Sequence, residues 1–254
     1  MPAKRLTEAK SRLGRDDLTL PFLSDVVQAL HESTLIDQVS IISSDLVIEN
    51  FVQELGCSII PEGAGRPGGL TSAIESGIQW CTSNNIERVL VVLGDLPCLS
   101  SKHVDAFLSL GEHNASSFLA DAEGTGSTMW MRSTRSAPNP RFGVRSRAAH
   151  RESGAVEIQG DDFAGARRDV DTQVNLWDAV RIGVGPATHR ALTGPLEETV
   201  VTISGIDPIT AVDESGLTLE LNESQIATIP RPRIGQRLVV HRLAPTRTSQ
   251  SLDQ

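Results

Sequence analysis

The stretch that decides the fold is Val89-Leu-Val-Val-Leu-Gly-Asp-Leu-Pro-Cys98, an apolar run that leads into a carboxylate and then a proline. Five consecutive aliphatic residues predict a strand that is buried on both faces, which is typical of parallel sheets. Pro97 has no N–H group for a strand ladder, so the strand is expected to end before it. Asp95 is therefore predicted at the carboxyl edge of the sheet, where α/β proteins bind ligands.

Short apolar runs of the same kind recur on both sides of this stretch, at residues 39–43, 57–61 and 117–120. Segments with helical periodicity lie between them, at residues 19–31, 45–55 and 70–81. Alternating strands and helices predict an α/β fold with a three-layer, mostly parallel, Rossmann-like sheet.

The pattern changes after about residue 187. Residues 199–203, 217–221 and 238–241 alternate between apolar and polar, and residues 213–216 between the first two runs are typical of a turn. We therefore expect a main domain at 1–187, a small β module at 188–243 and a disordered tail at 244–254. A stabilising cap or an oligomer contact is the preferred role for the module.

Composition excludes several classes of protein. The 254 residues are 39% hydrophobic and carry a formal charge of -9, which predicts a soluble globular protein and disfavours nucleic acid as a partner. The sequence shows neither an apolar run long enough for a membrane span nor a signal peptide, and the three cysteines lack metal-site spacing. A cytoplasmic protein is the expectation.

Two groups of acidic residues are candidates for metal binding. Asp95 could hold a hard cation at the strand end, but it could equally cap a helix that begins near Ser100. Asp169 and Asp171 would point the same way in an extended segment and could hold one Mg²⁺ between them. The alternative for this pair is a solvated acidic loop ahead of a helix at 174–182.

The amino-terminal segment is basic in an otherwise acidic chain, through Lys4, Arg5, Lys10 and Arg12. Such cations could neutralise a triphosphate and the departing pyrophosphate. A solvated terminal arm is the simpler interpretation of the same residues.

Two further segments could bind an anion. The loop at 121–128 is rich in glycine and hydroxyl groups and ends at Thr128, while Gly143 and Ser146 lie at an expected helix start. His150 would lie one turn after Ser146 on the same side, although a packed surface histidine is slightly favoured. The glycine cluster at 63–70 lacks a phosphate-loop motif and fits a nucleobase or ribose pocket better.

Taken in chain order, five of these motifs resemble one family across residues 2–183. They are Pro2-Ala-Lys-Arg-Leu-Thr-Glu-Ala-Lys-Ser-Arg-Leu13, Gly94-Asp-Leu-Pro-Cys-Leu99, the Gly124-Thr-Gly126 loop, Phe142-Gly-Val-Arg-Ser146 with His150, and Asp169-Val-Asp-Thr172. The family is that of the phosphoenolpyruvate or 2-phospho-L-lactate guanylyltransferases of coenzyme F420 biosynthesis.

The resemblance implies a fold like that of the molybdenum-cofactor nucleotidyltransferases, which is the nucleotide-diphospho-sugar-transferase type. It implies a Mg²⁺-dependent transfer of GMP from GTP to a small phosphorylated carboxylic acid with release of pyrophosphate, and it leaves a homodimer open. Residues that resemble the acceptor-binding set are Thr128, Gly143 and Ser146. Asp95, with Asp169 or Asp171, resembles the metal ligands, and the catalytic set comprises Asp95 and the triphosphate-binding residues Lys4, Lys10 and Arg12.

Three positions depart from the family pattern. An apolar strand normally precedes the Pro-x-Lys segment, whereas this sequence begins at Met1-Pro2, so we expect that strand to be missing. Either the start codon is wrongly placed or the edge of the sheet is rebuilt. Leu70-Thr71 replaces the usual Leu-Asn, and the β module has no counterpart. Two alternatives therefore stay open: a nucleotidyltransferase acting on a molybdopterin or sugar phosphate, and a catalytically inactive nucleotide-binding protein.

Overall fold

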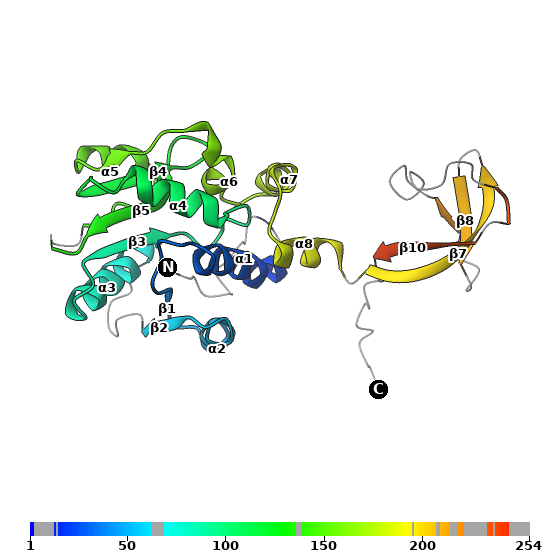
Figure 1. Cartoon of the computed structure of the whole chain (residues 1–254), viewed down its shortest axis with the longest axis horizontal. Helices are drawn as coiled ribbons and strands as arrows, with labels where there is room; N and C mark the ends of the chain where they lie inside the picture. The colour runs from blue at the N-terminus through cyan, green and yellow to red at the C-terminus, as the bar shows by residue number, and fades with distance from the viewer. Residues whose placement is uncertain are drawn as a thin grey trace. The chain divides into compact units, whose positions relative to one another are not determined.

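The computed structural model describes residues 1–2, 13, 15–61, 69–135, 139–194, 196–206, 209–213, 218–220, 233–235 and 237–243. The chain divides into two compact units, Met1–Ala191 and Leu192–Gln254 (Figure 1). The sequence pattern had suggested a boundary at residue 187. The basic residues Lys4, Arg5, Lys10 and Arg12, residues 62–68 of the glycine cluster and the tail at 244–254 lie outside the described residues.

The first unit alternates helices with strands, as expected from the sequence. Its elements are η2 (Asp16–Leu18), α1 (Thr19–His31), β1 (Ser40–Ser43), α2 (Leu46–Glu54), β2 (Ser58–Pro61), α3 (Leu70–Ser83), β3 (Arg88–Val92), α4 (Ser101–Leu110), β4 (Ser116–Ala120), β5 (Ser127–Ser133), α5 (Ser146–Glu152), β6 (Val156–Glu157), η3 (Asp161–Phe163), α6 (Ala164–Arg167), α7 (Gln173–Ile182) and α8 (Pro186–Thr193).

Two sheets carry the strands of this unit. β1 pairs with β2 in parallel, and the second sheet has the order β3-β5-β4-β6. β4 and β6 are parallel, whereas β5 runs antiparallel to both of its neighbours. The α/β fold is confirmed. The sequence pattern predicts no strand at β5, which makes the sheet mixed.

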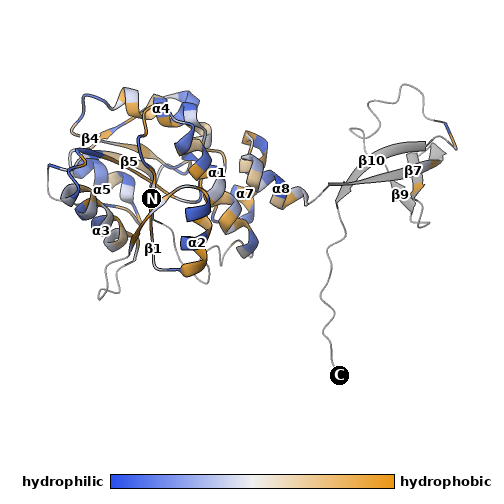
Figure 2. Cartoon of the chain, turned by 60° about the horizontal axis from the view of Figure 1, so that its bottom comes forward, coloured by the Kyte–Doolittle hydropathy of each residue, from blue (hydrophilic) through white to orange (hydrophobic). Residues whose placement is uncertain are grey.

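The core has the three layers that a sheet buried on both faces requires. Val92 and Met129 pack with α1 and α4, while the next residues along the strands, Val91 and Trp130, pack with α3 on the opposite face. Figure 2 shows the helices of this unit with alternating hydrophilic and hydrophobic bands, as expected for elements that bury one face. Among the described residues, no helix combines the length and apolar character that crossing a membrane demands.

Met1 and Pro2 form a short parallel contact with β1. The Met1 nitrogen donates to the Ser40 carbonyl at 2.7 Å, the Ile42 N–H donates to the Met1 carbonyl at 2.8 Å, and Pro2 forms a bridge with Ile42. Beyond these two residues, a cavity of about 740 Å³ separates β1 from β3, and its lining includes Val39, Ile74 and Leu90. Met1 thus lies beside β1 and also lines the cavity.

The second unit is an antiparallel sheet. It contains β7 (Leu196–Ile206), β8 (Ile209–Asp213), β9 (Thr218–Glu220) and β10 (Arg237–Leu243), in the order β10-β7-β8-β9. Three of these strands overlap runs that the alternating pattern had indicated, and β8 had not been anticipated.

The short helix α6 packs closely on the chain that follows β3. A Cβ atom added to Gly165 would overlap the carbonyl oxygen of Cys98 and would lie 2.8 Å from His103 Cε1. Because the first of these atoms belongs to the backbone, it cannot move aside as a side-chain end could. Glycine at this position therefore sets how near α6 comes to the end of β3.

We expect Gly165→Ala to lower the free energy of unfolding by about 1–3 kcal/mol, the usual cost of overpacking a buried contact. Urea denaturation of the full chain measures the change. Gly94→Ala is the matched control, because a Cβ there meets only ordinary contacts, at 3.6 Å from Leu23 Cδ1 and 3.8 Å from the Pro2 carbonyl. A change below about 0.5 kcal/mol is expected for the control, and equal losses in both variants would contradict the close approach of α6.

Candidate active site

Asp95 lies three residues beyond the last residue of β3, at the carboxyl end of that strand, and is half-buried. It does not cap α4: the hydroxyl of Ser100 accepts from the His103 N–H, and the His103 side chain in turn bonds the Ser100 backbone. This reciprocal capping box satisfies the start of α4 without a carboxylate from Asp95. Of the two interpretations that the sequence allowed for Asp95, capping is therefore excluded.

The segment after α6 is held between the ends of two strands by backbone hydrogen bonds. The Val170 N–H donates to the Asp95 carbonyl at 3.0 Å, and the Ala122 N–H donates to the Arg167 carbonyl at 2.8 Å. One bond joins the segment to the chain after β3, and the other joins it to the chain after β4. Asp169, which stands between the bonded residues, is thereby fixed at the carboxyl edge of both strands.

Three carboxylates meet at this edge: Asp121, Glu123 and Asp169 each offer an oxygen, and these oxygens lie within 4.8 Å of one another. The pKa of Asp169 is raised from 3.8 to about 7, chiefly because the side chain is desolvated and secondarily because Asp95 and the neighbouring carboxylates repel its negative charge. Oxygen ligands and accumulated negative charge suit a hard divalent cation. The site is therefore able to hold a metal ion.

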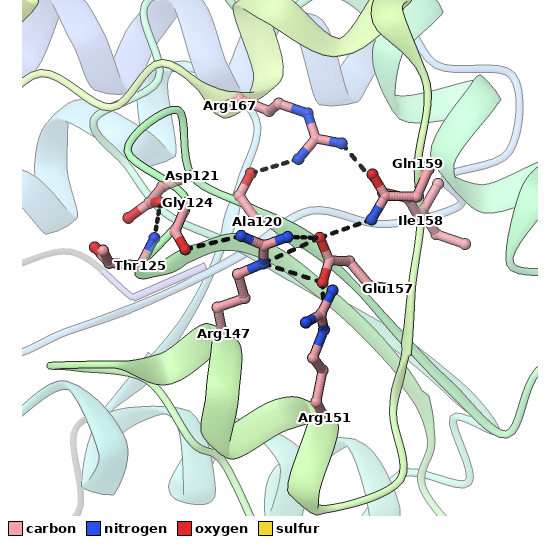
Figure 3. Close-up of polar contacts among 10 residues, drawn as sticks. All are labelled: Ala120, Asp121, Gly124, Thr125, Arg147, Arg151, Glu157, Ile158, Gln159 and Arg167. Carbon is pink, nitrogen blue, oxygen red and sulfur yellow. Dashed lines mark hydrogen bonds and ion pairs between the residues drawn. The ribbon is translucent and has the colours of Figure 1, made fainter.

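The loop that carries two of these carboxylates is braced from within and from outside. The Asp121 carboxylate accepts from the N–H groups of Thr125 and Gly126 at 2.8 and 2.6 Å. Arg147, from α5, donates to the Gly124 carbonyl at 2.9 Å and is itself held by Glu157, and Figure 3 shows these contacts around the loop. The loop is thus a rigid support for its acidic residues.

One arginine lies directly beside the acidic residues. The Arg168 guanidinium donates to Glu123 Oε1 at 2.6 Å and lies 3.6 Å from Asp178 Oδ2. Its side chain is only 14% exposed, so solvent screens this contact poorly. Arg168 offsets part of the repulsion among the carboxylates and orients Glu123.

A second polar group lies at the start of β5. The register shifts between Leu119 and Ala120, so Thr128 is an extra residue in the pairing of β4 with β5. Ser127 and Thr128 are consequently both buried: the Ser127 hydroxyl donates to Ser146 Oγ at 2.9 Å, and the Thr128 hydroxyl donates to the Ala166 carbonyl at 2.8 Å. The bulge lets consecutive side chains contact α5 and α6.

The structure brings some of the predicted site residues together. Asp95 and Asp169 interact electrostatically at the strand edge, and Ser146 begins α5 as expected, three residues after the exposed Gly143. Asp171 is exposed and is not among the carboxylates whose oxygens meet. The roles assigned to all these residues, and to the hydroxyl of Thr128, stay predictions.

Asp121 and Glu123 were not singled out as metal ligands from the sequence. Their loop was interpreted through its glycines and hydroxyl groups as an anion-binding loop. The available signal was their position directly after the buried run at residues 117–120, which places them at the same sheet edge as Asp95.

Comparison with known proteins identifies the family of this chain. The family described as "Guanylyl transferase CofC like" matches residues 1–155. The phosphoenolpyruvate guanylyltransferase of Mycobacterium leprae (strain Br4923) is 34% identical over 200 residues, which cover 74% of this chain and 90% of that protein.

Solved structures are similar at lower identity. A Mycobacterium sp. strain JC1 homologue of a Mycobacterium tuberculosis protein is 21% identical with a TM-score of 0.50, covering 72% of this chain and 96% of that one. A protein from Desulfovibrio desulfuricans G20 that is provisionally assigned to the nucleotide-diphospho-sugar transferases is 15% identical with a TM-score of 0.49, covering 72% and 93%. The family match extends over more than half of the sequence, and the chain belongs to the CofC-like guanylyl transferases.

Proposed function

We propose that this protein transfers GMP from GTP to phosphoenolpyruvate and releases pyrophosphate, as a cytoplasmic enzyme of coenzyme F420 biosynthesis. The observation that carries the proposal is the 34% identity to a phosphoenolpyruvate guanylyltransferase, over 90% of the length of that relative. The carboxylates that meet at the strand ends support it, because a cation held there would neutralise the charge of the phosphates during nucleotidyl transfer.

The acceptor supplies its own nucleophile. A phosphate monoester is largely a dianion at neutral pH, so its oxygen can attack the α-phosphorus of GTP without a general base. A bond forms between that oxygen and the α-phosphorus, the bond from the α-phosphorus to the bridging oxygen breaks, and pyrophosphate leaves. The protein's contribution is then positioning and charge neutralisation, which fits a site rich in charges.

The carboxylates are the residues that would hold Mg²⁺. Asp95 and Asp169, with Asp121 and Glu123 beside them, form an oxygen donor set of the kind that this cation prefers. When bound, Mg²⁺ would neutralise negative charge on the triphosphate. The raised pKa of Asp169 supports this role, since the carboxylate is electrostatically uncompensated without a cation.

The acceptor is proposed to lie near Ser146 and Gly143. Gly126 lies between the two groups: a Cβ atom there would overlap the Asp121 carboxylate and would lie 3.6 Å from Ser146 Oγ. Glycine at this position therefore lets the Asp121 carboxylate lie near the Ser146 hydroxyl group. An acceptor bound at Ser146 would thus lie close to the proposed cation.

Pyrophosphate release in the presence of GTP and each acceptor in turn tests the function. Phosphoenolpyruvate, 2-phospho-L-lactate and 3-phosphoglycerate share a phosphate and a carboxylate, so the assay also ranks specificity. We expect turnover with GTP and phosphoenolpyruvate to exceed that of every other pair. Preference for a sugar phosphate would favour a different nucleotidyltransferase, and nucleotide binding without turnover would favour an inactive protein.

Asp95→Asn is expected to lower kcat by about 100-fold or more, because it removes a charged ligand of the Mg²⁺ that would neutralise the phosphates. The melting temperature should change little, since α4 does not depend on Asp95 for its cap. Asp37→Asn, at an exposed position just before the amino end of β1, is the matched control and should leave kcat unchanged. Substantial residual turnover in Asp95→Asn would overturn the assignment.

Asp169 gives a prediction for the dependence of stability on pH. Its pKa is raised in the folded state, so between pH 4 and 7 the folded protein holds a proton that the unfolded chain has lost, and stability falls as pH rises through this range. At pH 8, without divalent ions, Asp169→Asn should therefore melt above the wild type by about 3 °C or more. The difference should shrink toward pH 4.

Adding Mg²⁺ at pH 8 should raise the melting temperature of the wild type more than that of Asp169→Asn, because the cation stabilises the ionised carboxylate. The exposed Asp161→Asn serves as control and should respond to Mg²⁺ like the wild type. Identical responses in Asp169→Asn and the wild type would argue against a cation at this residue.

A further inference from the structure

His150 is enclosed in an aromatic box. Its ring, on α5, is fully buried, and its centroid lies 5.2 Å from that of Phe118, 5.3 Å from that of Trp130 and 5.1 Å from that of Phe142. Phe118 and Trp130 come from β4 and β5, and Phe142 comes from the segment before α5. A phenylalanine would satisfy these surroundings by packing alone, so the packing does not explain why an imidazole is present.

The two ring nitrogens of His150 differ in their contacts. Nδ1 lies 3.5 Å from Ser127 Oγ, whereas Nε2 is buried and has no hydrogen-bond partner among the described residues. A buried polar atom without a partner destabilises the fold. Burial, and secondarily the charge of Arg141, lower the pKa of His150 to about 4, so the ring is neutral near pH 7.

The neighbouring hydroxyl groups indicate which nitrogen carries the hydrogen. With Ser127 Oγ as the donor to Ser146 Oγ at 2.9 Å, the only hydrogen of Ser127 is used in that bond. The Ser127 oxygen can then only accept from the imidazole, which requires the hydrogen on Nδ1. The chain of donors runs from His150 to Ser127 to Ser146, and it leaves the hydrogen of Ser146 available for a further acceptor.

We propose that His150 is a positioning residue of the acceptor site, which acts as a neutral Nδ1–H donor and orients Ser127 and Ser146 so that the Ser146 hydroxyl donates to an anionic oxygen of the phosphorylated acid. The inference rests on the proposed function for the identity of that acid. What the inference adds is the direction of the hydrogen bonds, by which the Ser146 hydroxyl presents its hydrogen, rather than a lone pair, to the negatively charged substrate.

Variants at residue 150 separate this role from packing. His150→Phe fills the box without a donor, and we expect its melting temperature to match or exceed that of the wild type while KM for phosphoenolpyruvate rises about tenfold, the usual effect of losing one hydrogen bond to a charged group. KM for GTP should stay within about twofold. His150→Asn places an amide near the position of Nδ1 and should recover most of the affinity for the acceptor.

Ser127→Ala tests the relay from its middle. It should raise KM for phosphoenolpyruvate as much as His150→Phe does, and the double variant should be no worse than either single one, because both remove the same chain of donors. Additive losses would overturn the relay. A stable His150→Phe with unchanged KM for the acceptor would overturn the positioning role.

The ¹⁵N chemical shifts of the His150 ring provide a measurement that does not depend on turnover. A hydrogen on Nδ1 near pH 7 supports the proposal, and a hydrogen on Nε2 overturns it even if the enzyme is fully active. Should the wild type fail to consume any phosphorylated acid, the proposed function would fall, whereas the ring shifts would still decide the direction of the hydrogen bonds.

Discussion

The hydrogen bond from the Val170 N–H to the Asp95 carbonyl is the constraint on which the site depends. It fastens the chain after α6 to the chain after β3, and the bond between Ala122 and Arg167 fastens the same segment to the chain after β4. Backbone atoms, rather than the reacting side chains, therefore set the spacing. The Asp95 and Asp169 side chains take no part in these two bonds.

Bringing these carboxylates together is electrostatically unfavourable. Asp169 is partly desolvated beside other carboxylates, which favours its neutral form. Only part of this cost is offset locally, by the N–H groups that bind Asp121 and by the guanidinium of Arg168 beside Glu123. A site with uncompensated negative charge is less stable when empty and gains more from a cation, as expected where strain is retained for function.

Sequence reasoning identified the layers and the acidic strand end because both follow from local patterns. The helices at residues 19–31 and 70–81 and the strand ending before Asp95 are all present, since apolar periodicity reports burial directly. The carboxylates beside Asp169 are harder to predict from the sequence, because the approach of the loop at 121–126 depends on bonds between residues distant in the chain. β5 was missed for another reason: six of its seven residues are buried, yet only Met129, Trp130 and Met131 are apolar, so the sequence shows neither an alternation nor a long apolar run.

The cavity between β1 and β3 has a consequence for how the molecule opens. Within the described residues, β1 and β2 form a sheet of their own, and their backbone ladder does not continue into the strands that carry the acidic residues. Side-chain packing therefore joins this corner to the remainder of the unit. Amide groups of β1 and β2 should exchange with solvent through a local opening that costs less free energy than global unfolding, so this corner would behave as a separate cooperative segment.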